Sequence, residues 1–204
     1  MGCTSSEGQS QLNIREPFYG NLFSRYNAID PKEISSKKFN KPFLEPEISF
    51  RVKNDINISD SPFGLDNIDD LFDGFVCSIE IVDFRFNKNL KEIGAFNLIA
   101  SNGASEYWMR NSEIFKLDQV NFDDHKVSVF FNDKLVGEGN TNKVLANPLN
   151  SALWLINTIA KKGEPLLKGQ FISTGTCTKA HELSPNIKIK ADFGSLGLIE
   201  FNYN

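Results

Sequence analysis

The sequence is poor in cysteine, has no excess of positive charge and contains no long apolar run. Its three cysteines are widely spaced and odd in number, so we expect reduced thiols and not a disulfide framework. The formal net charge of −4 argues against nucleic acid or an anionic membrane as a partner, because both favour a basic surface. No apolar run approaches the roughly 18 residues of a membrane span, and the polar N-terminus lacks the apolar core of a secretory signal. These absences favour a cytoplasmic protein that binds neither nucleic acid nor membranes.

The residues that are present predict one β-rich domain over residues 1–204. A chain of 204 residues is long enough to bury a substantial core, and no repeat or low-complexity linker divides it. Stretches rich in β-branched and aromatic residues, the pattern of buried strands, recur along much of its length. They predict strands at 43–53 and 75–86, a pair of strands within 127–139 around a turn at 132–134, and three strands within 169–176, 187–194 and 196–203.

One segment, "NPLNSALWLINTIAKKG", predicts an amphipathic helix. Asn147 suits the N-cap, Pro148 suits the first helical position, and Gly163 suits the left-handed residue that ends the helix. The apolar residues between them form a single stripe along one face.

Two other segments are predicted to be mostly irregular. Residues 1–40 are rich in turn formers, and the acidic segment 60–74 predicts a loop with a short helix around Ile68 to Phe72. The predicted fold class is therefore α+β and β-rich, with one main packed helix.

The stretch "FLEPEISF" at 43–50 places two carboxylates in a run that otherwise predicts a buried strand. Residues i and i+2 of a strand point to the same face, so Glu45 and Glu47 project together. A third acid, Glu80, lies within the apolar run 75–86. Buried carboxylates without partners are unfavourable and raise one another's pKa, whereas Mg²⁺ and Mn²⁺ favour carboxylate oxygens. These three side chains are therefore candidate metal ligands.

A plainer interpretation stays open from the spacing alone. Glu45 and Glu47 would line the solvent face of an edge strand, because exposed acids need no partner. Glu80 would then pair with Arg51 or Arg85. The two interpretations differ in whether the three acids converge.

Five stretches follow one another along the chain, namely "LEPEISF", "IEIVDFRF", "IASNGAS", "NPLNSALWLINTIAKKGEPLLKGQFISTGT" and "ADFGSLGLIEFNY". Together they resemble the 2-keto-4-pentenoate hydratase branch of the fumarylacetoacetate hydrolase-like superfamily, and the similarity spans essentially the whole chain. The resemblance implies the fumarylacetoacetate hydrolase C-terminal-like fold, a mixed β-roll or sandwich with one main packed helix. It also implies a homo-oligomer.

The resemblance implies a metal site and a reaction as well. In that family the Glu-x-Glu pair and the glutamate of the "EIVD"-like strand bind Mg²⁺ or Mn²⁺, and these positions match Glu45, Glu47 and Glu80. A small 2-oxo acid substrate would chelate the ion, which would stabilise enolate-like charge. The implied activity is a hydratase of the 2-keto-4-pentenoate type, a hydro-lyase of aromatic-compound catabolism. Decarboxylation of a 2-oxo acid and acylpyruvate hydrolysis are alternatives, because one metal site serves all three reactions.

Three more positions match substrate-binding parts of the family. Thr174 and Gly175 correspond to a loop near the substrate carboxylate, and Asn102 corresponds to an asparagine that lines the pocket. Ser101 replaces the aspartate that the family carries before this asparagine.

Two departures from the family pattern bear on activity. The family's catalytic lysine belongs to a Lys-x-Gly-x-Thr motif whose last four positions match residues 1–4, so the lysine would precede Met1, as would the family's N-terminal helical segment. The acid of the family's Pro-Asp-Phe-Gly stretch is replaced by Phe18. A further alternative is therefore a truncated, non-catalytic protein that binds metal and 2-oxo acids.

Overall fold

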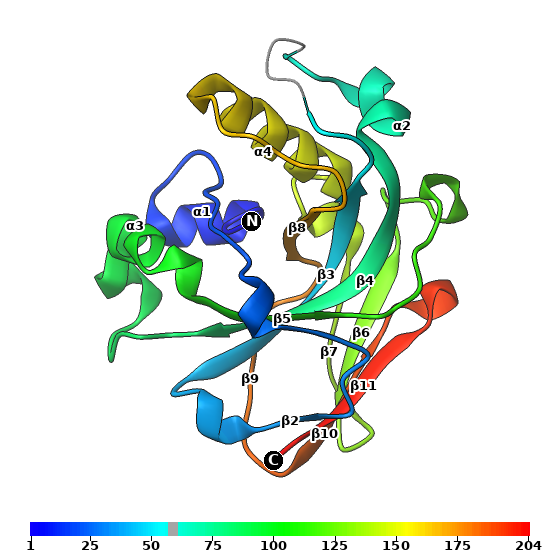
Figure 1. Cartoon of the computed structure of the whole chain (residues 1–204). Coiled ribbons are helices and arrows are strands. Elements are labelled where there is room, and N and C mark those ends of the chain that lie inside the picture. Colours follow the sequence, from blue (N-terminus) through cyan, green and yellow to red (C-terminus); the bar gives the residue numbers. More distant parts are fainter. Residues whose placement is uncertain (57–60) are drawn as a thin grey trace.

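The computed structural model describes residues 1–56 and 61–204, which form two β-sheets with helices at their outer faces (Figure 1). The predicted acidic segment 60–74 begins at Asp60, which lies outside the described residues. The rest of that segment contains the short helix α2 (Ile68–Leu71), as predicted.

The first sheet carries the candidate metal ligands. Its strands are β1 (Asn27–Ile29), β3 (Pro42–Val52), β4 (Phe72–Asp83), β5 (Ser105–Arg110), β8 (Phe171–Thr176) and β9 (His181–Glu182). They are arranged in the order β1-β5-β4-β3-β8, and β9 also pairs with β3. The two long strands β3 and β4 are therefore central.

The second sheet closes the other side of the core. Its strands are β2 (Glu33–Ile34), β6 (Lys126–Phe131), β7 (Lys134–Asn140), β10 (Ile187–Asp192) and β11 (Leu198–Tyr203), in the order β2-β11-β10-β6-β7. The predicted turn between β6 and β7 is confirmed. Asn132 and Asp133 both have left-handed φ values, of 48° and 64°, which match the twist of a tight hairpin.

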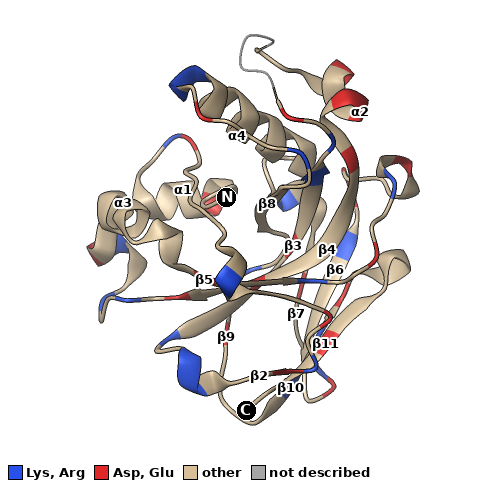
Figure 2. Cartoon of the chain, viewed as in Figure 1, with Lys and Arg blue, Asp and Glu red and all other residues tan. Residues whose placement is uncertain are grey.

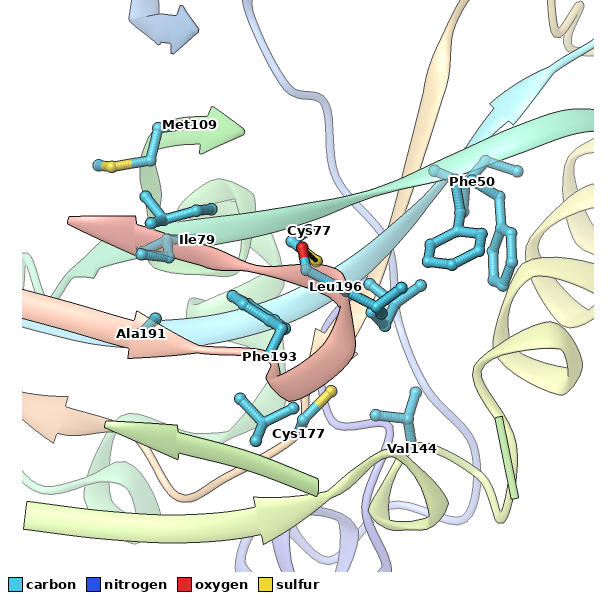
Figure 3. Close-up of a cluster of buried hydrophobic side chains, with 14 of the residues drawn as sticks. Phe50, Cys77, Ile79, Met109, Val144, Cys177, Ala191, Phe193 and Leu196 are labelled. Carbon is cyan, nitrogen blue, oxygen red and sulfur yellow. Dashed lines mark hydrogen bonds between the residues drawn. The ribbon is translucent and has the colours of Figure 1, made fainter. Parts of the chain in front are cut away.

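The hydrophobic core lies between the two sheets, and Figure 3 shows its middle. Side chains from β3, β4 and β5 of the first sheet meet side chains from β10 and the turn after it, and the labelled ones include Phe50, Ile79, Met109, Ala191 and Phe193. At one end, five phenylalanine rings pack with centroids 4.9 to 6.3 Å apart: Phe50, Phe72, Phe75, Phe115 and Phe122. Such aromatic burial contributes strongly to stability.

Helix α4 (Pro148–Lys162) has the predicted ends and packs against β8. The side chain of Asn147 caps its first turn, and Gly163 ends it with a φ of 73°. Lys161 and Lys162 lie in the last turn, where positive charge is favoured by the helix dipole, and they colour this helix end blue in Figure 2.

Two further helices are not predicted by the sequence. Helices α1 (Ser6–Leu12) and α3 (Leu90–Ala100) pack on each other over a small second core (Figure 1). The helical period is hidden because α1 buries only Leu12, and because Gly94, with a φ of 72°, interrupts α3.

Four strands are also absent from the sequence prediction: β1, β2, β5 and β9. Three of them, β1, β2 and β9, are only two or three residues long, which is too short for an alternating pattern to show. The α+β, β-rich fold class is confirmed. Within the described part of the chain, no helix has both the length and the apolar character that crossing a bilayer requires.

Candidate metal centre

Strands β3 and β4 pair antiparallel and bring the three predicted acids together. Glu45 lies directly opposite Glu80, and Glu47 follows two residues along β3 on the same face. Pro46 lies between them and does not interrupt the pairing with β4, because its backbone nitrogen and carbonyl point away from β4. Its carbonyl accepts a hydrogen bond from the N–H of Cys177 (2.8 Å), in the gap between β8 and β9.

The three carboxylates converge on one point. One oxygen from each lies within 4.8 Å of the others. Glu47 is fully buried and Glu80 is 5% exposed, whereas Glu45 is half-buried and borders a cavity together with Glu80. This convergence is what the metal interpretation of the sequence requires.

The arginines of the plainer interpretation are engaged elsewhere. Arg51 pairs with Asp73 at 2.7 Å, and Arg85 pairs with Glu106 at 2.5 Å. Among the described residues, no lysine or arginine side chain forms an ion pair with the three acids. The cluster therefore has no side-chain counter-ion among the described residues, and the positive charge of the N-terminal amine is the one that lowers the pKa values of Glu45 and Glu47.

A hydrogen-bond network from β8 and β5 fixes the orientation of Glu47. Its Oε2 accepts hydrogen bonds from the hydroxyl of Ser173 and from the N–H of Gly175 (3.0 Å). Ser173 Oγ in turn accepts a hydrogen bond from the indole N–H of Trp108 (3.2 Å). The other carboxylate oxygen, Oε1, is buried and has no hydrogen-bond partner among the described residues. A buried acceptor without a donor costs roughly 1–3 kcal/mol, so this oxygen is left for a ligand that the protein does not supply.

Burial and mutual repulsion raise the pKa values of the acids. Burial, followed by the charges of Glu47 and Glu80, raises the pKa of Glu45 well above its ordinary value. Burial, followed by the charge of Glu80, raises the pKa of Glu47 to about 7, although the hydrogen bonds from Ser173 and Gly175 lower it. Ionising all three carboxylates at this spacing therefore needs a cation.

The donor set of the cluster fits a hard divalent cation. It consists of carboxylate oxygens, which Mg²⁺ and Mn²⁺ prefer over nitrogen or sulfur. Oxygens around an octahedral Mg²⁺ lie about 3 Å apart when adjacent and about 4 Å apart when opposite. The three oxygens, which lie within 4.8 Å of one another, are thus near the spacing that one such ion requires.

The other predicted site residues lie around the cluster. Asn102 lines the cavity beside the carboxylates, and its side-chain amide exchanges two hydrogen bonds with the backbone of Asn21 (2.8 and 2.9 Å). The buried hydroxyl of Thr174 donates to the carbonyl of Ile48 (2.8 Å), and the N–H of Gly175 donates to the Glu47 carboxylate as described. The hydrogen-bonding groups of these three residues are thus directed to protein partners.

Phe18, at the position where the family resemblance leads us to expect an acid, lies beside the cluster. It lines both cavities that border Glu45 and is 8% exposed. Its ring packs on two glycines. A Cβ atom at Gly103 would lie 2.9 Å from the ring, and a Cβ atom at Gly2 would lie still closer. The ring therefore occupies space that side chains at these two positions would need.

The roles of Ser173 and Trp108 are not predicted by the sequence. Trp108 lies in β5, which the sequence does not predict, and nothing local marks either residue as part of a network around Glu47. The contact between Ser173 and Glu47 depends on the pairing of β3 with β8, and these two residues are 126 positions apart along the chain.

Comparison with known proteins agrees with the geometry, although no protein-family model matches the chain. The 2-keto-4-pentenoate hydratase 1 of Dechloromonas aromatica is 26% identical over 192 residues, which cover 94% of this chain and 69% of that protein. The solved structure of 4-oxalocrotonate decarboxylase from Pseudomonas putida G7, complexed with magnesium and adipate, has a TM-score of 0.90 and 26% identity. The match covers all of this chain and 76% of that one.

A fumarylacetoacetate hydrolase family protein from Yersinia pestis CO92 shares the fold, with a TM-score of 0.68 and 14% identity over the whole of this chain. The chain is therefore similar over nearly its whole length, in sequence and in fold, to the 2-keto-4-pentenoate hydratases and 4-oxalocrotonate decarboxylases, and it has the fold of the fumarylacetoacetate hydrolase family protein.

Proposed function

We propose that the chain is a metal-dependent enzyme that acts on a small 2-oxo acid, a hydro-lyase of the 2-keto-4-pentenoate hydratase type in aromatic-compound catabolism. The observation that carries this proposal is the convergence of three carboxylates around the partnerless buried oxygen of Glu47. Glu45, Glu47 and Glu80 would hold one Mg²⁺ or Mn²⁺ ion. Such an ion supplies a Lewis acid for the carboxylate and 2-oxo oxygens of the substrate.

The residues around the cluster prepare it for this role. Ser173 and Gly175 donate hydrogen bonds to Oε2 of Glu47, which leaves Oε1 free to bind the metal ion. Phe18 lines the cavity beside the cluster and gives it an apolar wall on one side. Asn102 is proposed to line the substrate pocket, where it holds the backbone of Asn21 in place.

The family's catalytic lysine would lie close to this cluster. The family pattern places it directly before Met1, whose backbone nitrogen donates to the carbonyl of Ser173 (2.9 Å). Met1 also lines the cavity that contains Glu45 and Glu80. A side chain at the preceding position would therefore adjoin the carboxylates and could transfer protons to a bound 2-oxo acid.

A decarboxylase is the second candidate, and a charge pattern favours it. The decarboxylase from P. putida G7 was solved with adipate, which is a six-carbon dicarboxylate. In this chain, a cavity that borders Glu45 is also lined by Lys143 and Lys179. Positive charge near the substrate tail suits a second carboxylate, which pentenoate substrates do not have.

Two assays on the purified protein test these alternatives. With Mn²⁺ present, a hydratase consumes 2-hydroxypentadienoate, followed by loss of the dienol absorbance, and a decarboxylase releases carbon dioxide from 4-oxalocrotonate. Glu80→Gln should abolish either activity together with Mn²⁺ binding measured by calorimetry. Mn²⁺ binding without turnover of any 2-oxo acid, acylpyruvates included, would favour the non-catalytic binding protein, and absence of Mn²⁺ binding would overturn the proposal.

We further propose that the chain forms one domain and a homo-oligomer in the cytoplasm. Large apolar side chains on the surface support self-association, because Phe96 is 90% exposed and Ile29 is 54% exposed. Sedimentation velocity should show an oligomer that Phe96→Asp weakens. A monomer at every concentration would contradict the homo-oligomer.

A further inference from the structure

Three buried serine side chains lie next to Glu47 on strands β3, β4 and β8 of the first sheet. Ser173 of β8 lies opposite Ser49 of β3 in the strand register, and Ser78 of β4 lies opposite Glu47. Ser49 and Ser78 are fully buried, and Ser173 is 3% exposed. Hydroxyl groups buried this deeply need hydrogen-bond partners within the protein, because a buried polar group without a partner is costly.

Hydrogen bonds join these hydroxyl groups to the Glu47 carboxylate. The Oγ atoms of Ser78 and Ser49 lie 2.7 Å apart, and those of Ser49 and Ser173 lie 3.0 Å apart. Ser173 in turn donates to Oε2 of Glu47. A longer contact of 3.2 Å joins the Ser78 hydroxyl to the backbone carbonyl of Glu47. The three serines and Glu47 therefore form one connected network across three strands.

The number of available protons fixes the direction in which this network donates. A serine hydroxyl donates one hydrogen bond and accepts two. Ser173 donates its one proton to Glu47, so it accepts the hydrogen bond from Ser49 as well as the one from the indole N–H of Trp108. The proton of Ser49 is thereby used, and Ser78 must be the donor in the 2.7 Å contact. All three hydroxyl groups therefore donate toward Oε2 of Glu47.

We propose that Ser49 and Ser78 are positioning residues, which hold the metal ligand Glu47 in its orientation through Ser173. With Ser49 and Trp108 as donors, Ser173 has no acceptor position left, and its single proton is directed at Glu47. Consecutive hydrogen bonds that run in one direction also polarise and strengthen one another. The inference rests on the proposed function, because the orientation of Glu47 affects activity only if this residue binds the metal.

The affinity for Mn²⁺, measured by calorimetry, tests this role. Ser49→Ala and Ser78→Ala should each weaken Mn²⁺ binding about threefold, which is less than the effect of Ser173→Ala, because neither residue contacts the carboxylate directly. In the Ser173→Ala background, Ser49→Ala should have no further effect, since its connection to the Glu47 carboxylate is already lost. Electron paramagnetic resonance of the bound Mn²⁺ should show an altered ligand geometry in Ser49→Ala.

Ser151→Ala is the matched control. Ser151 is also fully buried, but its hydroxyl donates to the backbone carbonyl of Thr174 (2.7 Å) and is not part of the network. This variant should lower the melting temperature as Ser49→Ala does, and it should keep the wild-type Mn²⁺ affinity and resonance spectrum.

The outcomes separate this inference from the proposed function. Unchanged Mn²⁺ affinity in Ser49→Ala or in Ser78→Ala would overturn the inference alone. So would a loss of affinity from Ser49→Ala that is equally large in the Ser173→Ala background, or that Ser151→Ala reproduces. Absence of Mn²⁺ binding by the wild type would overturn the proposed function, and with it the role of the serines.

Discussion

Replacing Glu80 by glutamine should stabilise the metal-free protein and at the same time abolish its stabilisation by metal. Glutamine keeps the size of the side chain and removes one of the three converging charges. Glu47 has a pKa of about 7 in the folded protein against an ordinary value of 4.5. At pH 8, holding this buried carboxylate ionised therefore costs about 3 kcal/mol.

Burial is the largest cause of that cost, and the charge of Glu80 is the second. Removing the charge of Glu80 should therefore raise the free energy of unfolding of the metal-free protein by roughly 1 kcal/mol. For a chain of this size, that raises the melting temperature by about 2–4 °C. In the wild type, Mn²⁺ at about 100 times its dissociation constant should add about 2.7 kcal/mol, or about 5–10 °C. Glu80→Gln should lose most of that increase.

Differential scanning fluorimetry of the wild type and Glu80→Gln at pH 8, in EDTA and in excess Mn²⁺, measures the stability of the metal-free protein and the shift that Mn²⁺ produces. Glu16→Gln removes an exposed charge that is not one of the three converging carboxylates, so it should change neither melting temperature by more than about 1 °C. The reasoning fails if Glu80→Gln melts below the wild type in EDTA, or if it retains the full Mn²⁺ shift.

The metal-free wild type should lose stability as the pH rises from about 4.5 to about 7, because in this window folded Glu47 keeps a proton that the unfolded chain has released. Urea denaturation in EDTA should show this decline relative to Glu47→Gln, and excess Mn²⁺ should remove it. The thiol of Cys3 has its pKa raised to about 11 by burial and then by the charge of Glu45. At pH 8 its alkylation by iodoacetamide, followed by mass spectrometry, should be about 100-fold slower than that of an ordinary thiol. Ser173→Ala should weaken Mn²⁺ binding about tenfold and remove a Mn²⁺-induced change in the fluorescence of Trp108, measured with Trp154 replaced by phenylalanine.

Each of these predictions has a contradicting result. Stability in EDTA that rises between pH 4.5 and 7 relative to Glu47→Gln would mean that the carboxylate is not destabilised in the fold. Alkylation of Cys3 at the rate of a free peptide thiol would show that the thiol is neither buried nor close to negative charge. Unchanged Mn²⁺ affinity in Ser173→Ala would show that the β8 hydrogen bond does not orient Glu47.

Local patterns predicted the parts of the site that depend on neighbours in sequence. The alternation of side chains in a strand placed Glu45 and Glu47 on one face, and helix capping placed both ends of α4. The apolar neighbours of Glu80 indicated that it is buried, which the structure confirms. In each case the signal lies within a few residues, where the backbone geometry is fixed by elementary rules.

The parts that could not be predicted depend on pairing between distant segments. The register that places Glu80 opposite Glu45 joins strands separated by a long connection, and no local pattern specifies it. The hydroxyl of Ser173 reaches Glu47 only because β8 pairs with the other edge of β3. A cavity that borders Glu45 likewise combines Lys143 and Lys179, which come from separate segments of the chain.

The ring of Phe18 limits the order in which mutations can accumulate beside the metal centre. At Gly2 the backbone φ is outside the left-handed region, so the ring alone forbids a side chain there, whereas Gly103, with a φ of 67°, is constrained by its backbone as well. Gly2→Ala should therefore be harmful while Phe18 is present and tolerated once Phe18 has become alanine. The effect of a side chain at position 2 thus depends on the residue at position 18, and a side chain fixed at position 2 after loss of the ring would block the return of phenylalanine.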